Sequence, residues 1–221
     1  MELRKDPNYP NIMFIKDVER IDFKCQRCGG CCKYRGDISL FPHDIPRIAK
    51  YLGMSCGDEF LTKYAIKEEV PDKPNLYKYV IKDKGDKMKT CIFYENNKCR
   101  IHPVKPPACF MFPFLDLSDD DIEIQLVDCV LQALKSEADG KNGKKPIEFL
   151  KAIPQYEEEK ALRERENRLM SRLYVKPYSK FYEGMYSAIC RILYLGYSTE
   201  DGIKEVEERL NQAEEWASYI I

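Results

Sequence analysis

The chain has 221 residues, enough for one domain or two small ones, and 44% of them are hydrophobic, which suffices for a core of ordinary size. Its 36 lysine and arginine residues almost balance its 37 aspartate and glutamate residues, so binding to nucleic acid or to a membrane surface through a broad charged face is not favoured. The first twenty residues lack the apolar stretch of a signal peptide, and no apolar run approaches membrane-spanning length. We therefore expect a cytoplasmic protein.

Two short helices are predicted early in the chain. The segment "FPHDIPRIAKYLG" (41–53) has helical spacing of its apolar residues and a stop signal at Gly53. The segment "EFLTKYAI" (59–66) follows a serine and an aspartate at capping-box spacing, which predicts a second helix.

Strands are predicted in the middle of the cysteine-rich part. "NLYKYVIK" (75–82) and "MKTCIFYE" (88–95) are rich in β-branched and aromatic residues, and the "DKGD" between them predicts a β-hairpin. "ENNK" (95–98) predicts a further turn. The alternation of apolar and polar residues in "IEIQLVD" (122–128) predicts a half-buried strand.

The last third of the chain has a helical pattern. A polar segment with two glycines (136–146) predicts a loop or linker. Beyond it, residues 156–174, 180–196 and 198–220 carry apolar residues near 3.6-residue spacing. These three segments predict a helical bundle that supports the rest of the protein.

The expected fold is therefore α+β and mostly helical. Residues 1–136 are expected to form an irregular, cysteine-rich metal-binding domain with short strands. Residues 146–221 are expected to form a helical region packed on it.

Ten cysteines set this chain apart, and nine of them precede residue 130. In a reducing cytoplasm they are not expected to form a disulfide framework. Metal ligation or thiol catalysis is the better interpretation. Cys56 and Cys190 lie in helical patterns and are predicted to be buried structural residues.

The densest group begins with Cys25, Cys28 and Cys31, two C-x2-C steps in succession. Such a step brings both sulfurs to one side of a tight turn, and the double step is typical of ferredoxin-like [4Fe–4S] binding. Gly29 and Gly30 permit positive φ and let backbone N–H groups approach the sulfurs.

Cys32 directly follows this run. In an extended chain, adjacent side chains point to opposite sides, so Cys31 and Cys32 are predicted to serve different sites. Two alternatives are open: a vicinal disulfide, and a small buried residue without a ligand role.

Four further thiols follow at Cys91, Cys99, Cys109 and Cys129. Several prolines near Cys91, Cys99 and Cys109 are expected to hold these three thiols without regular secondary structure, and "FMFPF" (110–114) supplies apolar bulk around them. The eight candidate ligands are twice the four that one zinc ion or one iron–sulfur cluster needs. Two sites, or one site with spare thiols, both fit.

The motifs "FKCQRCGGCC", "DIPRIAKYLG" and "CIFYENNKCRIHPVKPPACFMFPF" together resemble the YkgJ-type cysteine-cluster family, whose CxxCxxCC motif implies chelation of zinc or iron. The resemblance covers residues 23–129, and a related domain occurs in flagellin lysine N-methylases. His102 stands where the family commonly has tyrosine, and Lys105 where it has arginine. His102 is a candidate metal ligand, although a polar loop residue is the preferred interpretation.

The leading functional prediction is an iron–sulfur protein, with [4Fe–4S] favoured by the cysteine spacing and with a redox or enzyme protein as partner. A structural zinc module is the alternative, because irregular four-thiolate zinc sites exist. A cluster-dependent enzyme, such as a protein lysine methyltransferase, is the second alternative and rests on the family resemblance alone.

Overall fold

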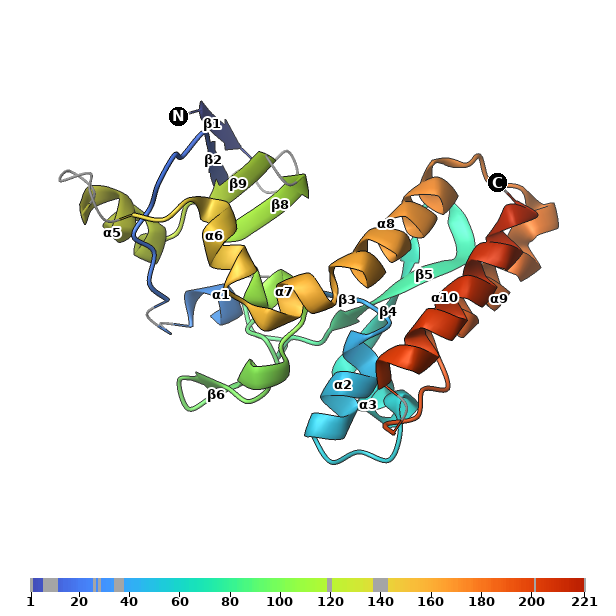
Figure 1. The fold of residues 1–221 in the computed structure, drawn as a ribbon. Helices are drawn as coiled ribbons and strands as arrows, with labels where there is room; N and C mark the ends of the chain where they lie inside the picture. Colours follow the sequence, from blue (N-terminus) through green and yellow to red (C-terminus); the bar gives the residue numbers. More distant parts are fainter. Residues whose placement is uncertain are drawn as a thin grey trace. The chain divides into compact units, whose positions relative to one another are not determined.

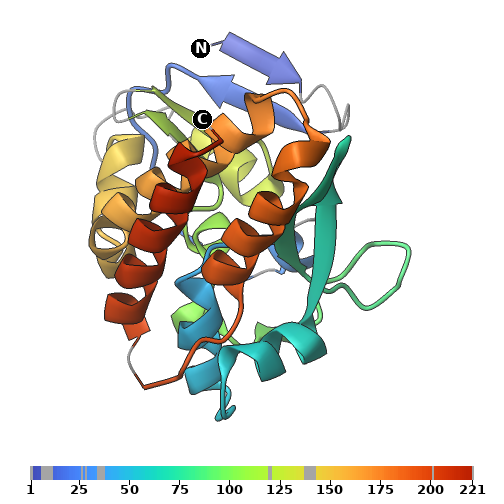
Figure 2. The same cartoon turned by 90° about the vertical axis from the view of Figure 1, so that its right-hand side faces the viewer.

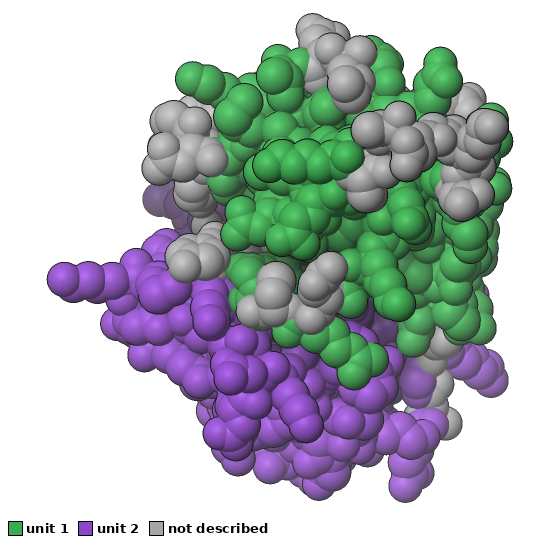
Figure 3. All heavy atoms as spheres, turned by 90° about the vertical axis from the view of Figure 1, so that its left-hand side faces the viewer, with its two compact units in different colours: residues 1–31, 107–158 green, residues 32–106, 159–221 purple. Residues whose placement is uncertain are grey.

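The computed structural model describes residues 2–5, 12–25, 27, 29–33, 38–118, 121–136, 143–200 and 202–220. Its contacts divide the chain into two compact units: unit 1 comprises residues 1–31 and 107–158, and unit 2 comprises residues 32–106 and 159–221 (Figure 3). Helices and small antiparallel sheets make up the described structure, which confirms the predicted α+β class with a helical C-terminal region. The sequence-based division into residues 1–136 and 146–221 stays a prediction.

Among its described residues, unit 1 contains a four-stranded antiparallel sheet in the order β1-β2-β9-β8. Its elements are β1 (Glu2–Lys5), β2 (Met13–Lys16), the first half of α1 (Gly30–Lys33), α4 (Pro107–Phe110), β8 (Phe114–Ser118), β9 (Asp121–Gln125), α5 (Asp128–Ser136), α6 (Pro146–Lys151) and α7 (Pro154–Glu158) (Figure 1). The strand predicted at 122–128 is confirmed as β9 over residues 122–125, but it was wrong over residues 126–128, the last of which begins α5. Strands β1, β2 and β8 carry no comparable signal in the sequence. The middle of the predicted 136–146 loop lies outside the described residues.

The core of unit 1 forms where this sheet packs against its helices. Its buried members are Ile15, Ile21, Phe110, Phe114, Ile124, Val130, Ala133, Leu150 and Tyr156. Because Phe114 and Ile124 face each other across the β8–β9 pair, the same side of the sheet reaches the core from both strands. This core holds the segments that carry several of the cysteines.

Unit 2 contains a small three-stranded antiparallel sheet, β3-β5-β4, in its described part. Its elements are β3 (Ser39–Leu40), α2 (Asp44–Tyr51), α3 (Gly57–Tyr64), β4 (Ala65–Val70), β5 (Lys73–Ile81), β6 (Tyr94–Glu95), β7 (Lys98–Cys99), the 3-10 helices η1 (His102–Val104) and η3 (Lys180–Tyr182), α8 (Lys160–Val175), α9 (Glu183–Tyr194) and α10 (Gly202–Ser218). Helix α9 packs on β5, where the ring of Tyr194 lies 6.1 Å from that of Tyr77 and 5.6 Å from that of Tyr79. Figure 2 shows α9 and α10 side by side.

The helix predicted at 41–53 is confirmed as α2, and Gly53 follows it with φ 69°. The turn predicted at 95–98 is confirmed too: Asn96 and Asn97 both have positive φ and join β6 to β7. Helix α3 ends at Tyr64, so the predicted second helix was wrong over its last two residues, which begin β4.

The predicted hairpin between residues 75–82 and 88–95 was wrong. Strand β5 pairs instead with β4, and the turn between them contains Asp72 at φ 61°. The "PDK" at this turn is a stronger hairpin signal than "DKGD". Asp72 tolerates the left-handed region, and the ring of Pro71, the residue before it in the turn, fixes the φ of that proline. Residues 88–95 contribute a single bridge to the earlier segment, Asp83 with Cys91.

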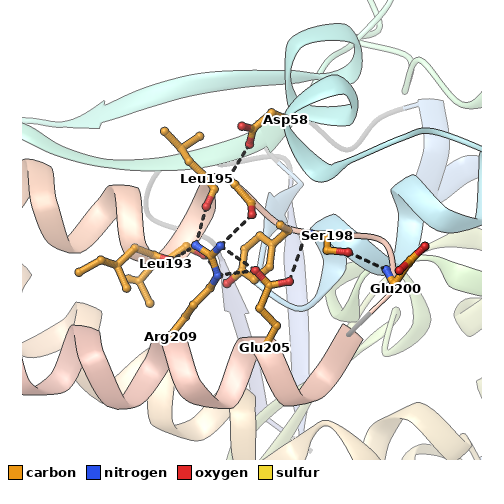
Figure 4. Close-up of polar contacts among 10 residues, drawn as sticks. Asp58, Leu193, Leu195, Ser198, Glu200, Glu205 and Arg209 are labelled. Carbon is orange, nitrogen blue, oxygen red and sulfur yellow. Dashed lines mark hydrogen bonds and ion pairs between the residues drawn. The ribbon is translucent and has the colours of Figure 1, made fainter.

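The connection from α9 to α10 is fixed by Arg209 (Figure 4). Its guanidinium donates hydrogen bonds to the carbonyl oxygens of Leu195 at 2.6 Å and Gly196 at 2.8 Å, and it pairs with Glu205 at 2.7 Å. The N–H of Gly196 donates to Asp58 at 2.8 Å. A cation at the end of α9 compensates carbonyl groups that have no partner within the helix.

No helix in the described ranges combines the length and apolar character that crossing a membrane requires.

Candidate metal centre

The N-terminal cysteine run leaves the core of unit 1 at Phe23. The Phe23 ring packs edge-on against Phe114 at 5.5 Å and Phe149 at 6.2 Å between ring centroids. Cys25 follows two residues later and is exposed. Aromatic packing therefore holds the base of the run while the first thiol stays accessible.

Only one of the two glycines in this run has the positive φ that the sequence predicts. Gly29 has φ 76°, as expected for a turn around a metal, and Arg27 has φ 52°. Gly30 instead begins helix α1. Cys28, the second predicted ligand, lies outside the described residues.

Cys31 and Cys32 lie on the short helix α1, which corrects the expectation of an extended chain. Their side chains still diverge, because successive residues of a helix are rotated by about 100°. The boundary between the two units falls between them, with Cys31 in unit 1 and Cys32 in unit 2. Both are half-buried.

Cys109 and Cys129 are held by the core of unit 1. Cys109 is half-buried on helix α4, next to the buried Phe110. Cys129 packs against the same core from helix α5, next to Val130. The expectation that Cys91, Cys99 and Cys109 stand outside regular secondary structure was therefore wrong for Cys109, whose helix begins at Pro107, where proline is tolerated. It was also wrong for Cys99, which ends strand β7. Unit 1 thus carries Cys25, Cys28, Cys31, Cys109 and Cys129.

Of the eight candidate ligands, unit 2 carries Cys32, Cys91 and Cys99. Backbone hydrogen bonds connect Cys32 with Cys91 and, through Tyr94, Cys91 with Cys99. The N–H of Cys91 donates a hydrogen bond to the carbonyl oxygen of Cys32 at 2.8 Å. The N–H of Tyr94 donates to the Cys91 carbonyl oxygen at 3.0 Å, and Tyr94 pairs with Cys99 across β6 and β7. Two segments that are distant in sequence, one around Cys32 and one from Cys91 to Cys99, therefore converge at these cysteines.

Aromatic and cationic side chains surround this second group. Arg100 lies over the rings of Tyr64 and Phe93, 5.2 and 5.5 Å from their centroids, and donates to the Tyr64 hydroxyl at 2.6 Å. The Lys33 ammonium lies 5.5 Å from the centroid of Tyr94. These contacts hold the side chains that follow Cys32 and Cys99 in the sequence.

The remaining candidates differ from one another. His102 is exposed on η1, three residues after Cys99. Cys56 is half-buried and precedes α3, so it is not inside a helix as predicted. Cys190 is fully buried in α9, its sulfur lies 3.4 Å from the backbone N and O of Tyr77, and burial raises the pKa of its thiol to about 12. Such a thiol is inert, as the sequence predicts for this residue.

Residues 24–131 match the family model CxxCxxCC, which is described as "Putative zinc- or iron-chelating domain". This segment is a CxxCxxCC domain. The match confirms the predicted family, includes all eight predicted ligand cysteines and leaves Cys190 outside. Neither the curated proteins nor the solved structures include one that matches the chain. A metal-binding role in the zinc or iron class follows for the CxxCxxCC domain.

A separate polar cluster, which sequence reasoning missed, is buried in unit 2. His43, Asp44 and Glu159 are each buried, and one candidate ligand atom of each lies within 4.8 Å of the others. Arg47 forms ion pairs with both carboxylates. Nε2 of His43 lies 3.1 Å from Oε2 of Glu159, at ion-pair distance but without a hydrogen bond between them.

Burial and neighbouring charges act on the two carboxyl groups of this cluster in opposite directions. Burial alone would raise the pKa of Glu159, but His43 and Arg47 outweigh it and lower the pKa. Burial raises the pKa of Asp44 even though Arg47 opposes it. Since a guanidinium already lies between the two carboxylates, we interpret the cluster as an ion-pair network that ties α2 to the start of α8. The only sequence signal was a histidine and an aspartate at the start of a helix, which ordinarily indicates capping.

Proposed function

We propose that this chain is an iron–sulfur protein whose eight candidate thiols hold one or two [4Fe–4S] clusters. The single observation that carries the proposal is the double C-x2-C step of Cys25, Cys28 and Cys31, which belongs to the same unit as Cys109 and Cys129. Three thiols from one turn and one from a second segment make up the ligand set of a cubane cluster. The positive φ of Gly29 supports the tight turn that this set needs.

Bound clusters would supply one-electron redox chemistry. The protein itself would hold the thiolates, limit access of water and donate backbone hydrogen bonds that tune the potential. The apolar anchors Phe23, Phe110 and Val130 stand within two residues of a candidate ligand, which suits this task. We propose a cytoplasmic role in electron transfer, or in support of a partner enzyme.

A second candidate, a zinc site, is favoured by a specific feature of unit 2. Cys32, Cys91 and Cys99 are linked through backbone contacts, and His102 follows on the next turn. Three cysteines and one histidine form a common structural zinc set. Under this alternative, unit 2 would bind zinc for stability and unit 1 alone would bind a cluster.

Anaerobic purification followed by absorption spectroscopy, before and after dithionite, tests the proposal. We expect a brown protein whose broad visible band bleaches on reduction, because sulfide-to-iron charge transfer weakens when the cluster is reduced. The Cys31→Ser variant should lose this band, and Cys190→Ser should keep it. A colourless wild-type protein, or a Cys31→Ser variant with an unchanged spectrum, would contradict the proposal.

A further inference from the structure

Residues of α8 and α10 line a cavity of about 380 Å³ in unit 2. The lining residues are Arg165, Arg168, Leu169, Arg172, Glu214, Ala217 and Ser218. This volume lies at the lower end of the range for small-molecule sites. Its three arginines stand three and four residues apart, so they share one face of α8.

One of these arginines is already neutralised. Arg165 forms a forked pair with Glu214, from Nε to Oε1 at 3.2 Å and from Nη2 to Oε2 at 2.6 Å. Its Nη2 also donates to Oδ1 of Asn211 at 2.8 Å. Both oxygens of Glu214, the one carboxylate among the described residues that line the cavity, are therefore occupied. Glu214 repels an incoming anion much less than an unpaired carboxylate would.

The other two arginines have no such compensation. Within the described part of the chain, Arg168 and Arg172 have no hydrogen-bond or ion-pair partner for their guanidinium groups. They stand one helical turn apart, where like charges destabilise a helix. The cavity therefore presents two exposed guanidinium groups that have no carboxylate partner among the described residues, beside the buried apolar side chains of Leu169 and Ala217.

This combination indicates what the cavity would bind. A guanidinium fork pairs with two oxygens of a carboxylate or phosphate. One carboxylate is satisfied by a single fork, whereas a phosphate monoester offers three oxygens and a charge near −2, which suits two forks. We propose that this cavity binds the phosphate monoester group of a small organic molecule through Arg168 and Arg172, with the organic part against Leu169 and Ala217.

The site is independent of the thiols. Every lining residue lies between 165 and 218, beyond the CxxCxxCC match at residues 24–131. If the protein proves to hold no iron–sulfur cluster, the phosphate site still stands. If the phosphate site proves wrong, the proposed iron–sulfur function still stands.

Calorimetric titration of the full chain with phenyl phosphate tests the inference, since this probe joins a phosphate monoester to an apolar ring. We expect saturable binding at one site per chain, weaker at higher salt concentration. Phenol, which lacks the anion, should not bind. Arg168→Gln combined with Arg172→Gln should weaken binding at least about tenfold, because hydrogen bonds between charged groups are lost.

Matched variants separate binding from folding. Arg191→Gln removes an exposed arginine of α9 and should leave the affinity for phenyl phosphate unchanged. Lysine at both positions 168 and 172 should give an intermediate affinity, because the charge stays and the fork is lost. Far-UV circular dichroism verifies that each variant is folded. Any of three results would overturn the inference. They are a wild type that shows no saturable binding of phenyl phosphate, a folded double glutamine variant that binds it as tightly as the wild type does, and benzoate that binds as tightly as phenyl phosphate.

Discussion

Replacing Glu166 by glutamine gives a direct test of the buried electrostatics in unit 2. Glu166 lies on α8 with a carboxyl group that is almost entirely buried, and its Oε1 accepts a hydrogen bond from the Tyr194 hydroxyl at 3.4 Å. Burial raises the pKa of Glu166 well above its usual value, and the nearby Asp44 adds to this rise. We therefore expect the carboxyl to be neutral in the folded protein near pH 7.

Because Glu166 holds its proton more tightly in the folded than in the unfolded protein, it makes the stability of the protein depend on pH. In the unfolded chain Glu166 loses its proton near pH 4.3, while in the folded chain it keeps it, so its contribution to stability falls as the pH rises. While the folded pKa exceeds the pH, the loss is about 1.4 kcal/mol per pH unit, or about 2 kcal/mol between pH 5.5 and pH 7. Glutamine is neutral in both states and keeps an oxygen for Tyr194, so Glu166→Gln should lack this loss.

The assay is urea unfolding of both proteins at pH 5.5 and pH 7, with the difference between wild type and variant taken at each pH. We expect the variant to gain about 2 kcal/mol relative to the wild type over this range. Glu164→Gln, on the same helix but 52% exposed, is the control and should show no such gain. Parallel pH dependences for Glu166→Gln and wild type would refute the reasoning, because they would mean that the buried carboxyl is ionised.

Four further outcomes are expected. Gly57→Ala should destabilise the protein by about 1–3 kcal/mol in urea unfolding, since the new Cβ would lie 2.6 Å from Cγ2 of Ile45 and 3.0 Å from Cβ of Tyr197; unchanged stability would show that these atoms yield. Lys73→Met should cost about 2–4 kcal/mol, because the Lys73 ammonium donates to three carbonyl oxygens at the end of α8; a loss below that range would mean that water replaces it. Cys190 should resist iodoacetamide at pH 8 in native protein, as seen by mass spectrometry, because burial raises its thiol pKa to about 12; rapid labelling would contradict its burial. Stripping the metal with a chelator under reducing conditions should lower the melting temperature, because metal binding and folding are coupled; an unchanged melting curve would separate the two.

The elements that the sequence predicts well are those in which a local signal and the tertiary packing agree. Helix α2 has apolar residues at helical spacing and Gly53 behind it, and the structure has both. Strand β9 alternates as predicted, with Ile124 buried in the core of unit 1. The C-terminal helices follow for the same reason.

The errors have two causes: a strand signal does not identify its pairing partner, and partners distant in sequence leave no local trace. The aromatic residues of β5 predict a strand but do not say which strand pairs with it, and β4 was nearer than residues 88–95. The distribution of ligand cysteines between the two units also depends on contacts made far along the chain, such as that between Cys32 and Cys91. The network around His43 unites residues more than a hundred positions apart, so no motif could reveal it.

The measurement that tests the central claim most directly is the iron, sulfide and zinc content per chain of protein purified without oxygen. The iron–sulfur proposal predicts about four or about eight iron atoms per chain with matching acid-labile sulfide. Iron-free protein with one or two zinc ions per chain would contradict it and would leave the CxxCxxCC domain as a structural zinc module.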